Sequence, residues 1–590
     1  MDKINITIDG KQLQVPKDYT ILQAARDAGI GIPTLCYLKD ANEIGACRMC
    51  LVEVKGGRVL QASCVCPVSD NMEVFTNSPA VRVARKSNLE LILSNHDRKC
   101  LTCVRSTNCE LQKLANDLGV TEMPFDGVNN EYEVDDLSAS IVRDNNKCIV
   151  CRRCVAVCRK NQSTAVIEAK NRGFKTTVGS PFDKSLRDVS CIMCGQCITA
   201  CPTGALREKD HTARVWDALA NSDLHVVVQT APSVRVALGE EFGMPMGSRV
   251  TGKMAAALKK LGFTKTFDTN TGADLTIMEE GTELIGRIKN GGKLPIITSC
   301  SPGWIKFCEH YYPEFLDNLS TCKSPHTMFG ALIKTYYAEK NGIDPKSIYV
   351  VSVMPCTAKK FEIERPVMEV DGLRDVDAVL TTRELARMIR TAGIDFAGIP
   401  DEPFDDPFGE ASGAGAIFGA SGGVTEAALR TVAEVITGNP LENVEINDVR
   451  GENGIKEYTV DLPDLLLKGV VVNGTANARK ILDKIKTGEA EYHFIEIMAC
   501  PGGCVTGGGQ PIVDAATKAC VNVYEKRAKA IYNEDKDLPV RRSHENPVIK
   551  KLYAEYLGEP NGHKAHHLLH TTFTKRELHP DDLMEKRTLK

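Results

Sequence analysis

The chain has 590 residues, a formal net charge of −4 and a hydrophobic fraction of 43%, which is typical of globular proteins. Its length exceeds what one hydrophobic core supports, so several domains are expected. The small charge gives no electrostatic reason to expect nucleic acid as a partner. No basic-then-apolar leader and no run of about 18 apolar residues occurs, which predicts a cytoplasmic protein without a membrane span. Cysteine is abundant, with 23 residues mostly before residue 202, and in a cytoplasmic protein this predicts metal binding rather than disulfides.

Residues 1–80 are predicted to form a small α+β domain of the β-grasp type. Apolar and polar residues alternate from Ile4 to Ile8, as in a half-buried strand, and Thr20 can cap a helix that ends near Ala28. The cysteines that follow have the pattern C-x10-C-x2-C-x13-C, which departs from the plant-type spacing. It resembles the 2Fe–2S domain that opens iron–iron hydrogenases and the large electron-transfer subunit of respiratory NADH dehydrogenases. The expected ligands of this 2Fe–2S cluster are Cys36, Cys47, Cys50 and Cys64.

Residues 81–125 are predicted to form a helical domain around a second metal site. One histidine precedes three cysteines in the pattern H-x3-C-x2-C-x5-C. Such a set could also hold zinc. The spacing resembles the one-histidine 4Fe–4S site of the same two families, and the neighbouring cysteine groups favour iron. The expected ligands are His96, Cys100, Cys103 and Cys109.

Residues 140–210 contain a duplicated cysteine run, which is the strongest signal in the sequence. Each copy has the spacing C-x2-C-x2-C-x3-C of two-cluster ferredoxins, in which the fourth cysteine of each run binds the other cluster. Zinc ribbons instead use separated C-x2-C pairs. With the two preceding sites, these two 4Fe–4S clusters would form a series that carries electrons between the surface and the rest of the chain. The expected ligands are Cys148, Cys151, Cys154, Cys158, Cys191, Cys194, Cys197 and Cys201.

Residues 211–540 show the alternation of strands and helices that is typical of parallel α/β layers. Ligands of open α/β sheets bind beyond the carboxyl ends of the strands. Cysteines follow several of the apolar strands, so these strand ends predict one shared site. Residues 541–590 are polar and rich in His and Lys, and are expected to wrap the surface as helices. The strands are expected at 225–228, 294–297, 349–353, 470–472 and 494–497.

Three cysteine motifs of this region carry a family resemblance: TSCSPGW at 298–304, MPCTAKKFE at 354–362 and EIMACPGGCVTGGGQP at 496–511. They look like the three signatures of the iron–iron hydrogenases, and the resemblance covers essentially the whole chain. It implies an α/β catalytic domain of two lobes around the H-cluster, preceded by the small iron–sulfur domains. The H-cluster is a 4Fe–4S cubane joined through one cysteine sulfur to a diiron unit with carbon monoxide, cyanide and azadithiolate ligands.

The resemblance also implies roles for single residues. Cys356, Cys500 and Cys504 would hold the cubane, and Cys504 would bridge to the diiron unit. A lysine and nearby backbone groups would donate hydrogen bonds to cyanide, while methionine and phenylalanine side chains would shield the diiron unit. The residues implied to surround that unit are Lys359, Pro232, Ser233, Met354, Met498 and Phe418.

The first motif departs from the family. Two adjacent cysteines are usual there, the first relaying protons to the bridging amine and the second binding the cubane. This sequence has Cys300 followed by Ser301. Either Ser301 binds iron through oxygen, or the loop shifts and Cys300 becomes the ligand, since a thiolate is the better iron ligand. The register favours the relay role for Cys300, and the sequence leaves both alternatives open.

A proton path is implied by residues outside the cysteine motifs. Glu280 and Glu283 lie one helical turn apart, Arg287 follows at i+4 from Glu283, and Ser320 lies downstream. Such a pair could also be an ordinary solvated helix face. The match to the family's proton channel, with titratable groups at relay spacing, favours the functional interpretation.

The predicted function is reversible hydrogen oxidation and proton reduction at the H-cluster. Electrons would pass through the accessory clusters to ferredoxin or to flavin-containing NAD(P)-linked partner subunits, because no flavin or nicotinamide motif is visible here. Maturation proteins would supply the diiron unit. The alternatives are a hydrogen sensor or an electron-transfer subunit without significant turnover, and an iron–sulfur assembly factor. The three motifs argue against an electron-transfer subunit and the glutamate pair against an assembly factor, whereas Ser301 keeps the sensor open.

Overall fold

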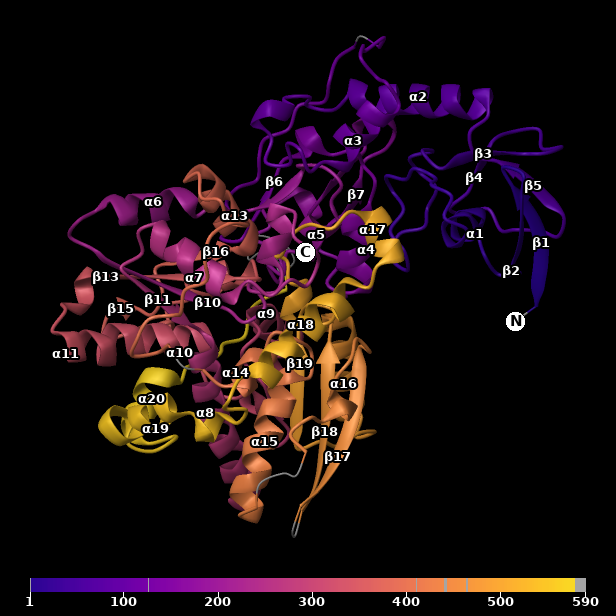
Figure 1. Cartoon of the computed structure of the whole chain (residues 1–590). Helices are drawn as coiled ribbons and strands as arrows, with labels where there is room; N and C mark the ends of the chain where they lie inside the picture. Colours follow the sequence, from indigo (N-terminus) through magenta and orange to yellow (C-terminus); the bar gives the residue numbers. More distant parts are fainter. Residues whose placement is uncertain (1, 126, 410, 440–442, 463–464, 579–590) are drawn as a thin grey trace, which may run out of the picture.

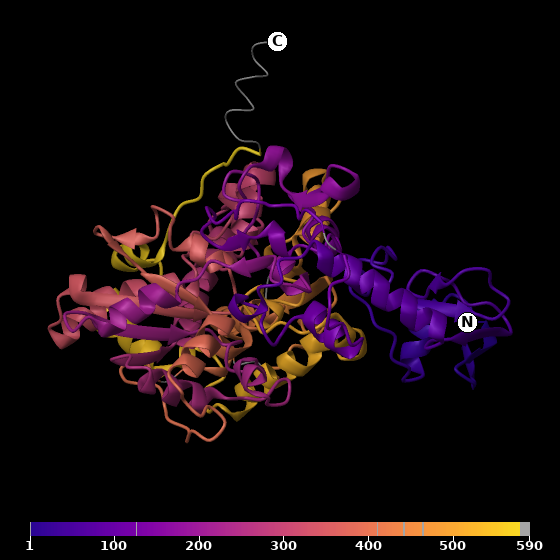
Figure 2. The same cartoon turned by 90° about the horizontal axis from the view of Figure 1, so that it is seen from above.

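The computed structural model describes residues 2–125, 127–409, 411–439, 443–462 and 465–578. Its N-terminal sheet stands to one side of the rest of the molecule (Figure 1 and Figure 2). This part contains β1 (Lys3–Ile8), β2 (Lys11–Pro16), α1 (Ile21–Asp27), β3 (Leu51–Val54), β4 (Gln61–Ala62) and β5 (Met72–Phe75). The strands lie in the order β2, β1, β5, β3, β4.

The N-terminal sheet follows the sequence pattern closely. Thr20 accepts a hydrogen bond from the Gln23 backbone, and the Thr20 backbone N–H donates to the Gln23 side chain, so a capping box starts α1. Ile6 and Ile8 are buried in the core of this domain, as the alternation predicts. Cys66 lies outside the predicted ligand set, and the sequence predicts an ordinary buried thiol there. It is instead partly exposed, just after a turn that follows β4.

A helix leads from this sheet to the body of the molecule (Figure 1). The connecting region contains α2 (Pro79–Ser94), α3 (Glu110–Asp117), β6 (Ile141–Arg143), α4 (Arg153–Lys160), β7 (Glu168–Lys170), β8 (Thr177–Gly179), α5 (Gln196–Ala200) and β9 (Leu206–Glu208). Each of the two cysteine runs passes through a short helix, α4 or α5, and these helices pack against each other. The duplicated sequence therefore folds into two paired units.

The first sheet of the body is parallel. Its strands are β11 (Lys265–Asp268), β10 (His225–Thr230), β13 (Ile348–Met354) and β16 (Ala378–Thr381), in that order. Val227, Val228 and Val350 are fully buried, as expected for parallel strands covered on both faces. The elements around this sheet are α6 (Thr212–Ala220), α7 (Thr251–Lys260), α8 (Asn270–Lys289), α10 (Pro325–Leu332), α11 (Ala338–Asn341), α12 (Ala358–Glu362), β14 (Glu369–Val370), β15 (Leu373–Arg374) and α13 (Thr382–Thr391).

The second sheet of the body is mixed, which differs from the purely parallel pattern expected. Its strands are β12 (Ile296–Ile297), β19 (Phe494–Met498), β18 (Leu465–Asn473) and β17 (Ile455–Leu462), and β17 pairs antiparallel with β18. The strand expected at 294–297 contains only the two isoleucines, since Pro295 has no N–H to donate to a ladder. The helices beside this sheet are α9 (Pro302–Tyr311), α14 (Gly413–Ile417), α15 (Gly423–Thr437) and α16 (Thr475–Lys486).

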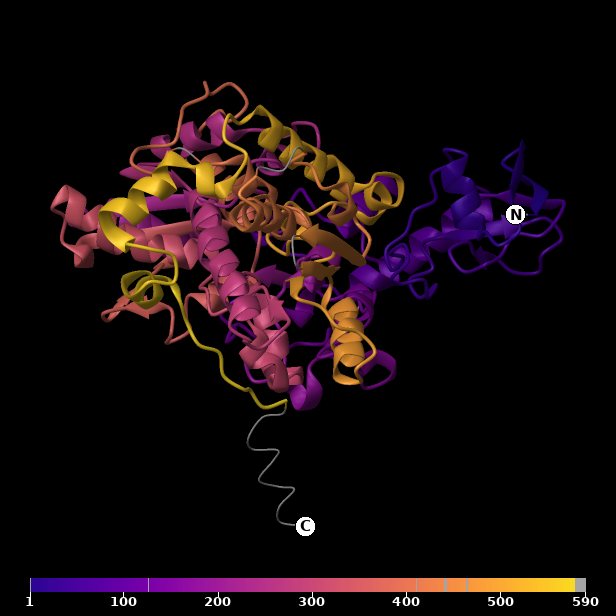
Figure 3. The same ribbon diagram turned by 90° about the horizontal axis from the view of Figure 1, so that it is seen from below.

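The C-terminal region runs over the surface of the body, as the yellow segments show in Figure 3. It contains α17 (Ala515–Cys520), α18 (Val523–Asp537), α19 (Pro547–Leu552) and α20 (His563–Leu569). Helix α19 packs on α8 and α20 on α10. The segment after α20 pairs with the loop before α10, with Thr571 N donating to Thr321 O at 2.8 Å. The sequence predicts surface helices over 541–590, and residues 579–590 of that range lie outside the described residues. Among the described helices, none has the length and apolar character to cross a bilayer.

Candidate active site

A cavity lies where strands of both body sheets end. β10 and β13 of the first sheet and β12 and β19 of the second direct their carboxyl-terminal loops into it, as expected for a ligand site of α/β sheets. All three cysteine motifs contribute to its wall. The lining residues from these motifs include Cys300, Ser301, Met354, Cys356, Lys359, Met498, Cys500 and Cys504. Pro232, Ser233 and Phe418 line the same cavity, so the structure brings every residue implied to surround the diiron unit to one place.

The thiols of Cys356, Cys500 and Cys504 all line this cavity and lie within electrostatic reach of one another. Burial and the neighbouring Cys356 raise the pKa of Cys504 to about 12, and burial also raises the pKa values of Cys356 and Cys500. Thiolates so close together and so dry need a strong positive charge beside them, which an iron cluster supplies. The loop between Cys500 and Cys504 turns through Gly503 at a φ of 92°, where an added Cβ would lie 2.7 Å from the Ser421 backbone nitrogen. The donor set and its tight loop fit a bound cluster.

The polar groups of the cavity also fit a bound anionic group. Lys359 Nζ donates to Glu362 Oε2 at 2.8 Å and to the Cys300 carbonyl at 3.2 Å. Although burial alone would raise it, Lys359 and His326 lower the pKa of Glu362 to about 2. Glu362 is therefore a carboxylate that fixes the lysine at the wall. The Ser233 hydroxyl is buried without a partner in the described residues, which is a donor left for a ligand.

Sequence reasoning missed Glu362, which holds this lysine, and His326, which holds Glu362. His326 Nε2 lies 2.6 Å from Glu362 Oε2, and His326 Nδ1 lies 3.1 Å from the Ser352 hydroxyl. Burial and the Lys359 charge lower the pKa of His326 to about 4, so this histidine is neutral. Glu362 could have been found, because it follows Lys359 by one helical turn within the second motif. His326 comes from α10, and nothing in its own sequence context distinguishes it.

Cys300 and Ser301 have different neighbours. Cys300 packs against the apolar cluster that contains Phe418 and Met498, and burial followed by the Glu280 charge raises the pKa of its thiol. The Ser301 hydroxyl accepts a hydrogen bond from the Ala499 backbone nitrogen at 3.2 Å, directly before Cys500. The Cys300 thiol is thus coupled electrostatically to the buried Glu280, and the Ser301 hydroxyl is held by the backbone that leads into Cys500.

The residues of the implied proton path lie together on α8 and the loop before α10. Ser320 Oγ donates to Glu283 Oε2 at 3.0 Å, and Arg287 Nη2 donates to Glu283 Oε1 at 2.6 Å. Glu280 is buried, and one of its carboxyl oxygens has no partner among the described residues. Burial and the Glu283 charge raise the pKa of Glu280 to about 8. At neutral pH, Glu280 therefore carries a proton in the interior, within electrostatic reach of both Cys300 and Glu283.

The predicted 2Fe–2S cysteines form two close pairs. Cys50 Sγ and Cys64 Sγ lie 3.3 Å apart, and the backbone nitrogens of Cys36 and Cys47 each lie 3.4–3.5 Å from the other residue's sulfur. Asn42 then connects this site to the duplicated run, donating to the carbonyl of Cys36 at 2.7 Å and to that of Cys151 at 3.0 Å.

The other predicted cluster sites also adjoin one another. Arg105 follows the second cysteine of the histidine-containing group and donates to the Cys201 carbonyl at 3.1 Å. Cys109 Sγ lies 3.6 Å from the carbonyl of Pro202, so this group also meets the duplicated run. Cys194 of that run lines the active-site cavity, and Thr357 of the second motif donates to the Met193 carbonyl at 2.7 Å. Both N-terminal sites therefore meet the duplicated run, which in turn meets the cavity.

Comparison with known proteins identifies the family. The model of the iron only hydrogenase large subunit, C-terminal domain, matches residues 224–508. The chain is 51% identical over 588 residues to NADP-reducing hydrogenase subunit HndD from Solidesulfovibrio fructosivorans, covering 98% of this chain and 100% of that relative. The chain belongs to the iron-only hydrogenase family. It is an iron–iron hydrogenase with accessory iron–sulfur domains, and the sensor and electron-transfer alternatives are not favoured.

Further relatives match the hydrogenase over different lengths. Iron hydrogenase 1 from Clostridium pasteurianum is 47% identical over 572 residues, covering 97% of this chain and all of that relative. A solved structure of a variant of the FeFe-hydrogenase HydA1 from Chlamydomonas reinhardtii is 43% identical with a TM-score of 0.56, and the match covers 62% of this chain and 99% of that one. The shared catalytic fold is therefore present here with additional domains.

Models of accessory domains match the remaining regions of the hydrogenase. They are the 2Fe-2S iron-sulfur cluster binding domain at 1–79, the NADH-ubiquinone oxidoreductase-G iron-sulfur binding region at 85–124, the 4Fe-4S dicluster domain at 147–205 and the iron hydrogenase small subunit at 521–576. These matches show 2Fe-2S and 4Fe-4S domains ahead of the catalytic region. The C-terminal helices, predicted only as a surface wrap, correspond to the small-subunit model.

Proposed function

We propose that the hydrogenase holds an H-cluster in the cavity between its two body sheets, with Cys356, Cys500 and Cys504 as cubane ligands. The convergence of these three thiols with Lys359 at one cavity supports this assignment more than any other observation. Lys359 and the Ser233 region would bind the cyanide ligands, and Met354, Met498 and Phe418 would cover the diiron unit. When bound, the cluster would supply the redox chemistry that interconverts hydrogen with two protons and two electrons.

We assign the proton relay to Cys300 and the fourth cubane position to Ser301. Burial and the Glu280 charge raise the pKa of the Cys300 thiol, which keeps it protonated and able to donate. Ser301 Oγ is held beside Cys500 by the Ala499 backbone. A serine oxygen is a harder ligand than a thiolate, and it would distinguish this cubane from one with four cysteines.

The proton would move through side chains that the fold holds in sequence. Cys300 Sγ would exchange a proton with the Glu280 carboxyl, the Ser320 hydroxyl would connect Glu280 to Glu283, and Arg287 would fix the Glu283 carboxylate. The pKa of about 8 for Glu280 suits a group that must both hold and release a proton near neutral pH.

Electrons would reach the cavity by a branched series of clusters. The 2Fe–2S site and the histidine-containing site would both deliver electrons to the duplicated 4Fe–4S run. The hydrogen bonds of Asn42 to the Cys151 carbonyl and of Arg105 to the Cys201 carbonyl support this route. Cys194 would bring the last accessory cluster to the cavity wall. Two surface entries suit two kinds of partner. Ferredoxin and a flavin-containing NAD(P)-linked subunit are the proposed partners, and the name of the relative HndD supports the second.

Iron content tests this assignment. The ligand sets predict about 20 iron atoms per chain after full maturation and about 18 when the diiron unit is missing. Protein produced anaerobically without maturation proteins should hold the lower content, show electron paramagnetic resonance signals of 2Fe–2S and 4Fe–4S clusters when reduced, and evolve no hydrogen. Zinc at the duplicated run would contradict the proposed electron route.

A further inference from the structure

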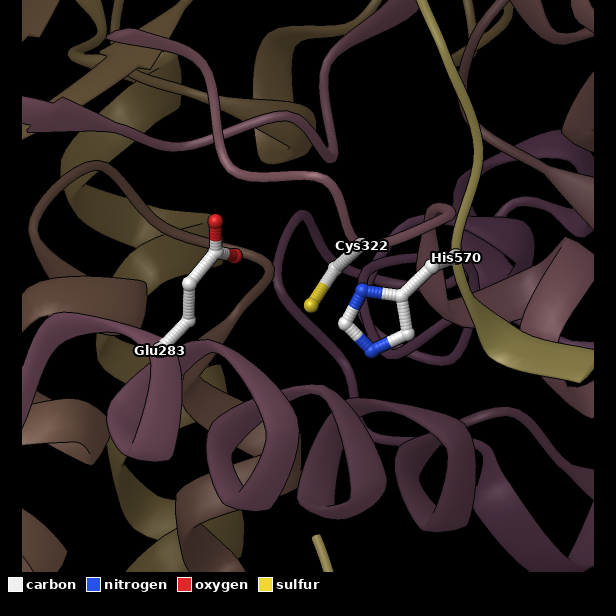
Figure 4. Close-up of side chains that lie close together, drawn as sticks. All are labelled: Glu283, Cys322 and His570. Atoms are coloured by element: carbon white, nitrogen blue, oxygen red, sulfur yellow. The ribbon is translucent and has the colours of Figure 1, made fainter. Parts of the chain in front are cut away.

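The interior around the cavity contains many buried charged and polar groups, and many of them have partners in the protein. Figure 4 shows one such cluster, in which the Glu283 carboxylate, the Cys322 sulfur and the His570 ring lie together. Glu283 accepts hydrogen bonds from two side chains, and both nitrogens of His570 lie within hydrogen-bonding distance of neighbours. Lys306 differs. It is only 3% exposed, yet its ammonium forms no hydrogen bond or ion pair within the part of the chain that the structure describes.

The helix that carries this lysine, α9, runs from the first cysteine motif along the second cysteine run. An added Cβ on Gly303 would lie 3.4 Å from the carbonyl oxygen of Ile192, and the hydroxyls of Tyr311 and Ser190 lie 2.8 Å apart. Ser190 and Ile192 are the residues on either side of Cys191. The lysine follows Gly303 by three residues, so both belong to one face of the helix. The helix therefore places the lysine near the predicted ligand Cys191.

The acid that follows Lys306 on α9 is already paired with other cations. Glu309 accepts hydrogen bonds from both Arg365 and Arg576. Two guanidiniums exceed its single negative charge, so the buried ammonium needs another anion. Electrostatics points to the cysteine site, because burial lowers the pKa of Lys306 to about 8 and the charge of Cys191 opposes this shift. Burial raises the pKa of the Cys191 thiol, and Lys306 is the first of the influences that oppose it.

An aromatic ring holds the ammonium in place. Lys306 Nζ lies 4.6 Å from the centre of the Phe361 ring, which is within the range of a cation–π interaction. Phe361 packs on the apolar cluster that includes Cys191, and Cys197 and Cys356 pack on the same cluster. The charge is therefore fixed in an interior region beside the cysteines, where salt and water screen it much less than at the surface.

We propose that Lys306 is a positioning residue for the last electron-transfer step toward the cavity, because its fixed positive charge stabilises the reduced form of the nearest accessory 4Fe–4S cluster. Net charge is one of the factors that set the potentials of such clusters, and reduction adds one negative charge, which the ammonium attracts. The electron comes from the preceding accessory cluster and passes on to the cubane, while the lysine keeps its proton and no bond forms or breaks. This inference rests on the proposed electron route. The predicted ligands of this cluster are Cys158, Cys191, Cys194 and Cys197.

The test is an anaerobic redox titration of the fully matured hydrogenase, followed by electron paramagnetic resonance. Lys306→Met keeps an unbranched side chain of similar length and removes the charge. For one 4Fe–4S signal of this variant, the ratio of reduced to oxidised cluster at a given potential should fall about tenfold, which equals about 59 mV for one electron. Lys306→Arg keeps a positive charge and should stay near the parent value. Lys480→Met, which changes an exposed lysine on α16, should also leave every cluster signal unmoved.

The possible results separate this inference from the proposed electron route. An unmoved potential in Lys306→Met, with all cluster signals present, would overturn the role of Lys306 and leave the route standing. Equal shifts in Lys306→Met and Lys306→Arg would show that packing rather than charge matters, and would also overturn it. Loss of the cluster itself from both Lys306→Met and Lys306→Gln, measured as about four iron atoms fewer per chain, would do the same. A parent chain without 4Fe–4S signals from the duplicated run would instead refute the proposed route.

Discussion

Neutralising Glu283 should lower the pKa of Glu280. The two residues lie at i and i+3 on α8, where side chains are about 6 Å apart, and unit charges at that distance interact by about 3 kcal/mol at an effective dielectric constant near 20. Arg287, 2.6 Å from Glu283, offsets part of this repulsion. If about 1.4 kcal/mol of the repulsion between Glu280 and Glu283 remains, it raises the pKa of Glu280 by about one unit. Glu283→Gln should therefore move the pKa of Glu280 from about 8 to about 7, and burial should keep it above its ordinary value.

Infrared difference spectroscopy measures this shift directly. The carboxyl C=O band of Glu280 should be strong at pH 6 and fade as the pH rises through about 8, because the raised pKa keeps the proton bound below that pH. The band should be missing in Glu280→Gln, and its midpoint should be unmoved by Glu491→Gln, which alters an exposed carboxylate. An unchanged midpoint in Glu283→Gln, or a band that persists in Glu280→Gln, would refute the reasoning.

The remaining predictions concern the ligands and one ion pair. Cys504→Ala should abolish turnover and retention of the diiron unit while the electron paramagnetic resonance signals of the accessory clusters persist; retained turnover would contradict the ligand assignment. Cys300→Ala should keep a normal infrared spectrum of the H-cluster but lose about 10²–10⁴-fold in rate, whereas loss of the cubane would make it the ligand. Ser301→Cys should keep activity with a shifted cubane potential, and an unshifted potential would argue against iron ligation. Arg153→Met should lower the free energy of unfolding by about 1–3 kcal/mol, because it leaves the partly exposed carboxylate of Glu110 without its buried guanidinium partner, and the variant should be proteolysed faster than the parent chain within 85–124.

The sequence was most informative where chemistry depends on local spacing. A short C-x2-C-x2-C run places thiolates on one turn regardless of the surrounding fold, so the cluster groups could be recognised without a structure. Strand ends were informative for a related reason, since parallel strands bring their carboxyl ends to one edge of a sheet. Cys356 and Cys500 were expected at one site on this ground, and the structure places them at one cavity although they follow strands of different sheets.

Contacts between distant segments could not be predicted in the same way. His326 and Glu362 meet across α10 and α12, and Asn42 binds the carbonyl of Cys151, 109 residues away. His570 reaches Glu279 over 291 residues. Such partners carry no periodicity or spacing in the sequence, because their proximity is created only by tertiary packing. The strand β17 was missed although it does have a local pattern. Its alternation of charged and apolar residues is a weaker signal than the continuous apolar run of its neighbour β18.

Infrared spectroscopy of the anaerobically matured hydrogenase tests the central claim most directly. Carbon monoxide and cyanide ligands absorb in a spectral region where proteins themselves do not, so their bands report the diiron unit at the cavity. We predict these bands in the matured chain, their disappearance in Cys504→Ala, and a shift of the cyanide bands in Lys359→Met, which removes the ammonium at the cavity wall. A matured, hydrogen-evolving chain without such bands, or one whose bands survive unchanged in Cys504→Ala, would contradict the account.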